Sequence, residues 1–165
     1  MPDEIRDTGG ERTIHLERVY AASPAEMWQA WTDPIRLTRW LGHPAGSLLG
    51  AAAPVRLRLG DDPDQWADVR VLRAVEPRLL ELAWDFPGQS GSVLRVEIVP
   101  IAAGQSRLII DHRGLGGSST GYGAGWQAYL DGSLRAETGV AADESWDTLF
   151  ARALPAWQRR AASLT

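Results

Sequence analysis

The chain has 165 residues, a formal charge of -4, an isoelectric point near 5.4 and no cysteine. The acidic balance argues against a nucleic-acid partner, because proteins that bind nucleic acids usually present a basic face. Without cysteine there is no disulfide, thiol nucleophile or cysteine-ligated zinc. No apolar run approaches the length of a membrane span, and the polar residues 1–12 lack the apolar core of a signal peptide. We therefore expect one cytoplasmic domain with no membrane partner.

The first part of the chain predicts one strand and two short helices. Residues 1–12 are expected to form a flexible leader that ends in a pair of glycines. Residues 13–20 alternate between apolar and polar side chains, which predicts a strand. Ser23 and Glu26 have the spacing of a capping box with Pro24 at the first helical position, which predicts a helix. Asp33 predicts the cap of a second short helix over residues 35–41.

The middle of the chain is typical of consecutive strands. Apolar and polar side chains alternate, and turn residues such as Ala103-Gly104 separate the segments. The predicted strands are residues 54–60, 66–75, 79–86, 92–101 and 105–113. A strand, two short helices, a meander and a later long helix indicate an α+β fold with an antiparallel sheet, rather than repeated βαβ units.

One amphipathic helix is predicted over residues 121–137. Its apolar face carries Tyr122, Trp126 and Tyr129 at helical spacing. Glycines at positions 121, 123 and 125 suggest that its backbone closely approaches another element, which we expect to be the inner face of the sheet.

A final helix is predicted over residues 144–164, and Pro155 is expected to kink or split it. Residues 139–165 thus form a helical extension, which we expect to pack on the same domain. A homodimer contact is the alternative.

Several strings, in this order, resemble a known superfamily. They are residues 17–28, Trp31-Thr32-Asp33-Pro34, Trp40, residues 71–84, residues 108–115 and residues 121–126. Together they resemble the helix-grip, START-like superfamily, which includes the Bet v 1 allergens and polyketide cyclases. The resemblance is closest to bacterial proteins similar to the C-terminal domain of the activator of Hsp90 ATPase. It implies a START-like domain over residues 13–138, in which a curved antiparallel sheet wraps around the long helix. It also implies a cavity between sheet and helix that holds a hydrophobic ligand in many members.

The candidate ligand-binding residues are mostly aromatic, because large aromatic walls suit a flat apolar ligand. Each of them also fits an ordinary core, and the pocket interpretation depends on the cavity that the resemblance implies. The candidate set is Trp28, Trp31, Trp40, Trp84, Phe86, His112, Tyr122 and Trp126.

His112 is also the candidate catalytic residue, because the ordinary pKa of histidine lies near neutrality. The alternative is a hydrogen-bonded structural histidine. His15, His43 and His112 have no metal-ligand spacing, so no metal is expected. The glycine-rich residues 114–125 lack the third glycine of a dinucleotide fingerprint, so no cofactor is expected.

Three functions remain open. The first is non-catalytic binding of a small hydrophobic or aromatic ligand in the cavity. The second is a cyclase or aromatase in which His112 or Tyr122 moves a proton in the same cavity. The third is a protein-interaction domain, as the co-chaperone resemblance implies. The fold alone does not decide among these three functions, because one scaffold hosts unrelated functions. The binding function is the leading hypothesis.

Overall fold

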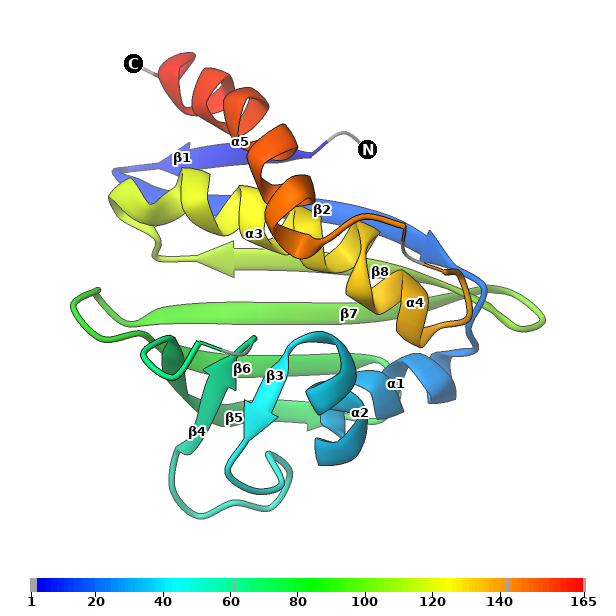
Figure 1. Cartoon of the computed structure of the whole chain (residues 1–165). Helices are drawn as coiled ribbons and strands as arrows, with labels where there is room; N and C mark the ends of the chain where they lie inside the picture. The colour runs from blue at the N-terminus through cyan, green and yellow to red at the C-terminus, as the bar shows by residue number, and fades with distance from the viewer. Residues whose placement is uncertain (1–2, 61, 142, 165) are drawn as a thin grey trace.

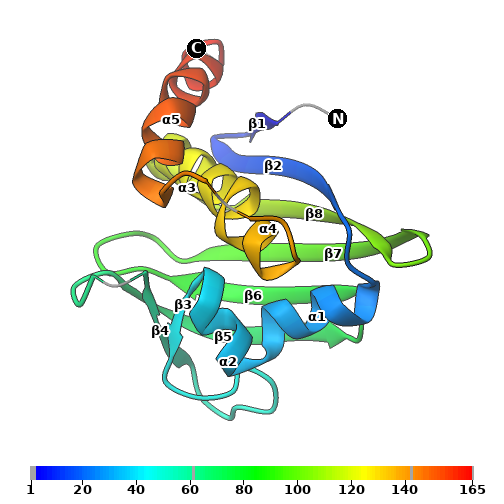
Figure 2. The same cartoon turned by 45° about the vertical axis from the view of Figure 1, so that its right-hand side comes forward.

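The computed structural model describes residues 3–60, 62–141 and 143–164. Within these ranges eight strands form one antiparallel sheet in the order β1-β2-β8-β7-β6-β5-β4-β3. Figure 1 shows α3 lying across one face of this sheet, and Figure 2 shows α1 and α2 beside its other half. The strands are β1 (Glu4–Thr8), β2 (Glu11–Tyr20), β3 (Gly42–Pro44), β4 (Val55–Leu59), β5 (Trp66–Val75), β6 (Leu79–Asp85), β7 (Ser92–Ala102) and β8 (Gln105–Arg113). The predicted α+β helix-grip fold is confirmed.

The helices are α1 (Pro24–Thr32), α2 (Pro34–Trp40), a short 3-10 turn (Gly116–Ser118), α3 (Ser119–Asp131), α4 (Ser133–Glu137) and α5 (Trp146–Ala162). The capping box at α1 is confirmed. The Glu26 backbone N–H donates to the Ser23 hydroxyl at 3.1 Å, and the Ser23 N–H donates to a Glu26 carboxylate oxygen at 3.2 Å. No helix of the described residues combines the length and apolarity needed to cross a membrane.

The flexible leader predicted for residues 1–12 is wrong over its described part. Residues 4–8 form β1, an edge strand whose Ile5 pairs with Ile14 of β2 and is buried. Gly9 and Gly10 both have positive φ angles, of 63° and 89°, and they make the tight turn that returns the chain. These glycines close a hairpin, where the sequence suggested the end of a leader. Residues 1 and 2 lie outside the described residues.

The long helix predicted over residues 121–137 is divided into α3 and α4 by Gly132. This glycine has φ -110° and ψ -93°, outside the helical region. A Cβ there would lie 2.6 Å from Leu149 Cδ1 and 2.8 Å from the Ala128 carbonyl oxygen, so α5 packs directly on the break. The change of direction lets the Ser133 hydroxyl donate to the Trp40 carbonyl oxygen at 2.7 Å, which links α4 to the end of α2.

Pro155 does not split α5, which runs without interruption from Trp146 to Ala162. Proline has no backbone N–H, so the carbonyl oxygen of Ala151, four residues earlier, loses its helical hydrogen bond. Ala151 is exposed, and water can donate to this carbonyl instead. α5 packs against α3, and Trp157 of α5 is fully buried. The closest approach involves Gly123 of α3, where an added Cβ would overlap the Trp157 ring. The expectation that these glycines approach the sheet is therefore wrong: Gly123 and Gly125 have α5 residues as their nearest neighbours, and nothing lies within 4 Å of a Cβ placed at Gly121.

Opposite charges alternate across several strands on one face of the sheet. Arg73 of β5 pairs in register with Glu81 of β6, and Glu81 pairs with Arg95 of β7. Arg95 pairs with Asp111 of β8. Asp111 in turn pairs with His15 of β2, whose Nδ1 lies 2.7 Å from the carboxylate. Cross-strand pairs of opposite charge stabilise a sheet, and the row ends at the buried His15, whose Nδ1 has this carboxylate as its partner.

Candidate ligand pocket

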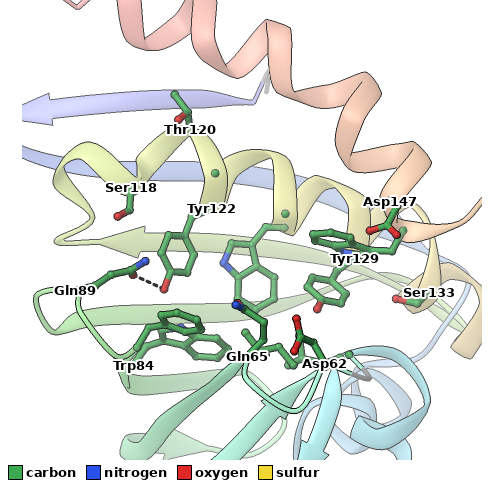
Figure 3. A pocket seen from close by; sticks show the side chains of 18 of the residues that line it. Asp62, Gln65, Trp84, Gln89, Ser118, Thr120, Tyr122, Tyr129, Ser133 and Asp147 are labelled. Carbon is green, nitrogen blue, oxygen red and sulfur yellow. Dashed lines mark hydrogen bonds between the residues drawn. The ribbon is translucent and has the colours of Figure 1, made fainter.

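A pocket of about 1030 Å³ lies between α3 and the strands. Its walls come from α3 with the 3-10 turn before it and the start of α4 after it, from the ends of β4 and β6 with the loops that follow, from the end of α2, and from the start of α5. Figure 3 shows the side chains of α3 and of the strands pointing toward one another across this space. The helix and the curved sheet thus border it on opposite sides, and it is open to solvent.

Seven aromatic side chains line the pocket. They are Trp40, Trp84, Phe86, Tyr122, Trp126, Tyr129 and Trp146. Tyr129 is the centre of one group, because its ring centroid lies 6.3 Å from that of Trp40, 5.9 Å from Trp126 and 5.4 Å from Trp146. Such rings are large and stiff, and they lose little entropy when a ligand packs on them.

The two tyrosines of the pocket remain protonated at neutral pH. Burial raises the pKa of Tyr129 to about 12. Burial also raises the pKa of Tyr122, and the neighbouring Trp84 side chain opposes this only in part. The Tyr122 hydroxyl donates to the Gln89 side-chain oxygen at 2.9 Å, as Figure 3 shows. Both hydroxyls are therefore hydrogen-bonding groups rather than bases.

His112 lies behind the pocket wall and is fully buried. The Trp126 indole N–H donates to His112 Nδ1 at 3.0 Å, so Nδ1 is an acceptor and the ring proton is on Nε2. His112 Nε2 then donates to the Ser92 hydroxyl at 2.8 Å, and this hydroxyl donates to the Trp84 carbonyl oxygen at 2.9 Å. Every polar atom of the imidazole therefore has a partner inside the protein.

Burial lowers the pKa of His112 to about 3. A neutral imidazole with its one lone pair already accepting a hydrogen bond has no free site for a substrate proton. The His112 cluster instead orients Trp126, which lines the pocket and also stacks on the ring of Trp31 with the centroids 5.8 Å apart. The geometry matches the structural role that the sequence left open for this histidine.

The structure brings five of the eight candidate residues to the pocket, namely Trp40, Trp84, Phe86, Tyr122 and Trp126. Trp28, Trp31 and His112 do not line it. Trp28 and Trp31 are each 1% exposed, because α1 turns both indoles into the core. Trp31 supports the wall from behind by packing against Trp40 at 4.8 Å and Trp126.

The candidate set also missed residues that line the pocket. Tyr129 was available from the sequence, because it follows Trp126 by three positions on the same helical face. Trp146 had no local signal, since only the packing of α5 on α3 brings it to the pocket. The same holds for Asp62 and Gln65, which come from the loop between β4 and β5.

The described residues contain no group of three or more histidine, aspartate or glutamate side chains that could hold a metal ion.

The curved antiparallel sheet with a helix across it defines a START-like domain. The family model described as Activator of Hsp90 ATPase homolog 1-like protein matches residues 21–139, and the chain belongs to this family. Among curated proteins, no sequence matches significantly.

Solved structures of this fold are similar over most of the chain. The crystal structure of CalU16 from Micromonospora echinospora is 23% identical with a TM-score of 0.73, over 96% of this chain and 95% of that chain. A protein from Bordetella parapertussis is 22% identical with a TM-score of 0.71, over 94% of this chain and 87% of that chain. An HSP90 activator from Plasmodium falciparum is 17% identical with a TM-score of 0.59, over 72% of this chain and 90% of that chain. At these identities the likeness establishes the fold.

Proposed function

We propose that the chain binds a small hydrophobic or aromatic ligand in the pocket under α3, without catalysing a reaction. The observation that carries this proposal is the pocket itself, with its volume of about 1030 Å³ and its seven aromatic side chains. Ligand sites are typically concave and mostly apolar, with volumes of roughly 300 to 1,000 Å³ and a few polar groups. Burying apolar area against these rings supplies roughly 25 cal/mol for each Å² removed from water.

The second hypothesis, a cyclase or aromatase, needs a group that moves a proton. His112 is separated from the pocket by Trp126 and keeps both nitrogens in hydrogen bonds. Tyr122 and Tyr129 have raised pKa values, which makes them weaker acids than free tyrosine. These properties favour binding over proton transfer.

The third hypothesis, a protein-interaction domain, draws on the family description and on the Plasmodium falciparum neighbour. A docking surface would need apolar side chains gathered in one place. The large apolar residues that are exposed belong to six different segments of the chain: Val19, Ile35, Leu49, Leu72, Ile101 and Val140. No single segment of the described chain presents several of them together, so the third hypothesis has less support than the pocket gives the first.

Energy transfer from tryptophan to pyrenemethanol, a neutral flat aromatic, tests the proposal. Gly121 lines the pocket, and nothing lies within 4 Å of a Cβ placed there. Gly121→Phe should therefore fill part of the pocket without disturbing the core, and Gly121→Ala is its matched control. We expect saturable binding that weakens about tenfold in Gly121→Phe and is retained in Gly121→Ala. Absence of saturable binding to any aromatic probe, charged or neutral, by the folded protein would overturn the proposal.

A further inference from the structure

We infer that the ligand is a flat aromatic compound that carries a protonated amine. This inference rests on the proposed function and adds the charge of the ligand to it. It follows from the charged side chains of the pocket, from where they lie, and from the aromatic faces beside them.

The charged groups of the pocket lining have one sign. Among the described lining residues the charged side chains are Asp62 and Asp147, and the lining contains no arginine or histidine. The absence of arginine from the described lining residues is informative, because the chain has 17 arginines in total and no lysine. A ligand carboxylate or phosphate would meet two carboxylates and no cation in this lining, whereas an ammonium group would meet opposite charge.

Asp62 is held in place by its own turn. One of its carboxylate oxygens accepts the Asp64 backbone N–H at 2.9 Å, and its carbonyl oxygen accepts the Gln65 N–H at 3.2 Å. The turn fixes the side chain at the pocket, and the second carboxylate oxygen is available for a ligand. Figure 3 shows Asp62 on the loop side of the pocket, opposite α3.

Asp147 contributes the second charge from the other side. It lies in the first turn of α5, next to Trp146, and its side chain is exposed. In Figure 3 Tyr129 lies between the loop that carries Asp62 and the helix that carries Asp147. The two carboxylates therefore flank the aromatic group around Tyr129.

The aromatic group favours the same class of ligand. Three tryptophan rings surround Tyr129, with their centroids within 6.3 Å of its own: Trp40, Trp126 and Trp146. The faces of such rings carry partial negative charge and attract cations, and tryptophan does so most strongly. An aromatic ligand packs on the rings through its apolar surface, and its ammonium group gains from both the ring faces and the carboxylates.

Three probes with one ring system test this inference: pyrenemethylamine, pyrenemethanol and pyrenecarboxylate, as a cation, a neutral compound and an anion. Energy transfer from tryptophan reports each dissociation constant at neutral pH and low salt. We expect the amine to bind at least about tenfold more tightly than the carboxylate, with the alcohol between them. The preference should shrink when salt is added, because exposed carboxylates are screened.

The variants assign the preference to these two carboxylates. Asp62→Asn with Asp147→Asn should abolish it while the affinity for pyrenemethanol stays the same, which shows that the pocket is intact. The amide oxygen that Asp62→Asn introduces can still accept the Asp64 N–H, so the turn is preserved. The matched control, Asp64→Asn with Asp143→Asn, changes the net charge equally at residues that do not line the pocket, and it should keep the preference.

The outcomes separate the two proposals. Equal binding of all three probes, or tighter binding of the carboxylate, would overturn the cationic ligand and leave the proposed function in place. A preference for the amine that survives in the Asp62/Asp147 double variant, or that disappears equally in the control, would overturn its assignment to these carboxylates. Failure of every probe to bind would overturn the proposed function together with the inference.

Discussion

The two sides of α3 differ in how they are packed. On one side the helix meets α5, where Trp157 is fully buried against Gly123 and its indole N–H donates to the Gln127 side-chain oxygen at 2.8 Å. On the other side the helix faces the sheet across the pocket, where Tyr122 and Tyr129 are only partly buried. The first side has no space for one added carbon, and the second has space for a ligand. The stability of the fold and the proposed binding therefore depend on different faces of one helix.

His112 belongs to the tightly packed part of the protein rather than to the pocket, although it lies close to the pocket wall. Its ring lies within 4.8 Å of the Tyr122 ring, between centroids, yet its hydrogen bonds all run to Trp126 and Ser92. The pocket wall is thus built in two layers, with aromatic side chains lining the pocket and a satisfied polar network behind them. Such a network fixes the orientation of the groups that it joins.

The largest expected effect is on the closed side of α3. Trp157→Ala should lower the free energy of unfolding by about 3–5 kcal/mol, because it leaves a large cavity between α3 and α5. Urea unfolding followed by circular dichroism measures this.

Gly123→Ala provides the control for that contact. In the wild type its Cβ would overlap the Trp157 ring, so the variant should be less stable by about 1–3 kcal/mol. In a Trp157→Ala background the same change should be harmless. An equal loss in both backgrounds would show that the ring is not the reason for the glycine.

A smaller loss is expected in the layer behind the pocket. His112→Gln at pH 7 should lower the free energy of unfolding by about 1–3 kcal/mol, since one residue cannot serve both Trp126 and Ser92 as the imidazole does. Differential scanning calorimetry measures the change. An unaltered stability would mean that the network around His112 contributes nothing, and Arg113→Gln, at an exposed neighbour, serves as the control.

The pH dependence of stability follows from the same residue. The folded pKa of His112 is lowered from 6.5 to about 3, so below pH 6.5 the unfolded chain binds a proton that the folded protein does not. Stability from this group is complete above about pH 6.5 and falls as the pH drops toward 3, by at most about 1.4 kcal/mol for each pH unit. Urea titrations of wild type and His112→Gln between pH 7 and 4 isolate this contribution. Parallel curves would contradict a neutral buried histidine.

The open side should respond in binding more than in stability. Tyr129→Ala removes the ring at the centre of the aromatic group and should weaken pyrenemethanol binding about tenfold. Tyr129→Phe keeps the ring and loses only the hydroxyl, so its affinity should stay within about twofold. If both variants lost affinity equally, the hydroxyl rather than the aromatic face would be the binding group.

The elements that were predictable from the sequence are those with local causes. The capping box at Ser23 and Glu26 and the alternation in residues 66–75 and 105–113 act between near neighbours, and the corresponding helix and strands were found with these bounds or close to them. β1 was missed because a five-residue edge strand has little pattern of its own and depends on its partner β2.

The pocket was only partly predictable because its walls come from distant parts of the chain. The face of α3 gave Tyr122 and Trp126, yet the direction of Trp28 and Trp31 depends on how α1 packs on the sheet. Trp146, Asp62 and Asp147 reach the pocket from a loop and from α5, and no periodicity in the sequence joins them to α3. The role of Gly123 was also misassigned, since a glycine indicates a close approach without naming the partner.

The smallest predicted effect is a change in stability that differs in sign between two glycines of α3, Gly121 and Gly123. Gly121 is exposed, and nothing lies within 4 Å of an added Cβ, whereas Gly123 is buried against Trp157. Gly121→Ala should therefore raise the free energy of unfolding by up to about 1 kcal/mol, because alanine loses less backbone entropy than glycine in a helix. A thermal unfolding curve beside that of Gly123→Ala measures the difference, and the two changes should have opposite signs. A loss of stability in Gly121→Ala would mean that this first turn of α3 needs glycine for its backbone, and the open side of the helix would then be constrained by more than its side chains.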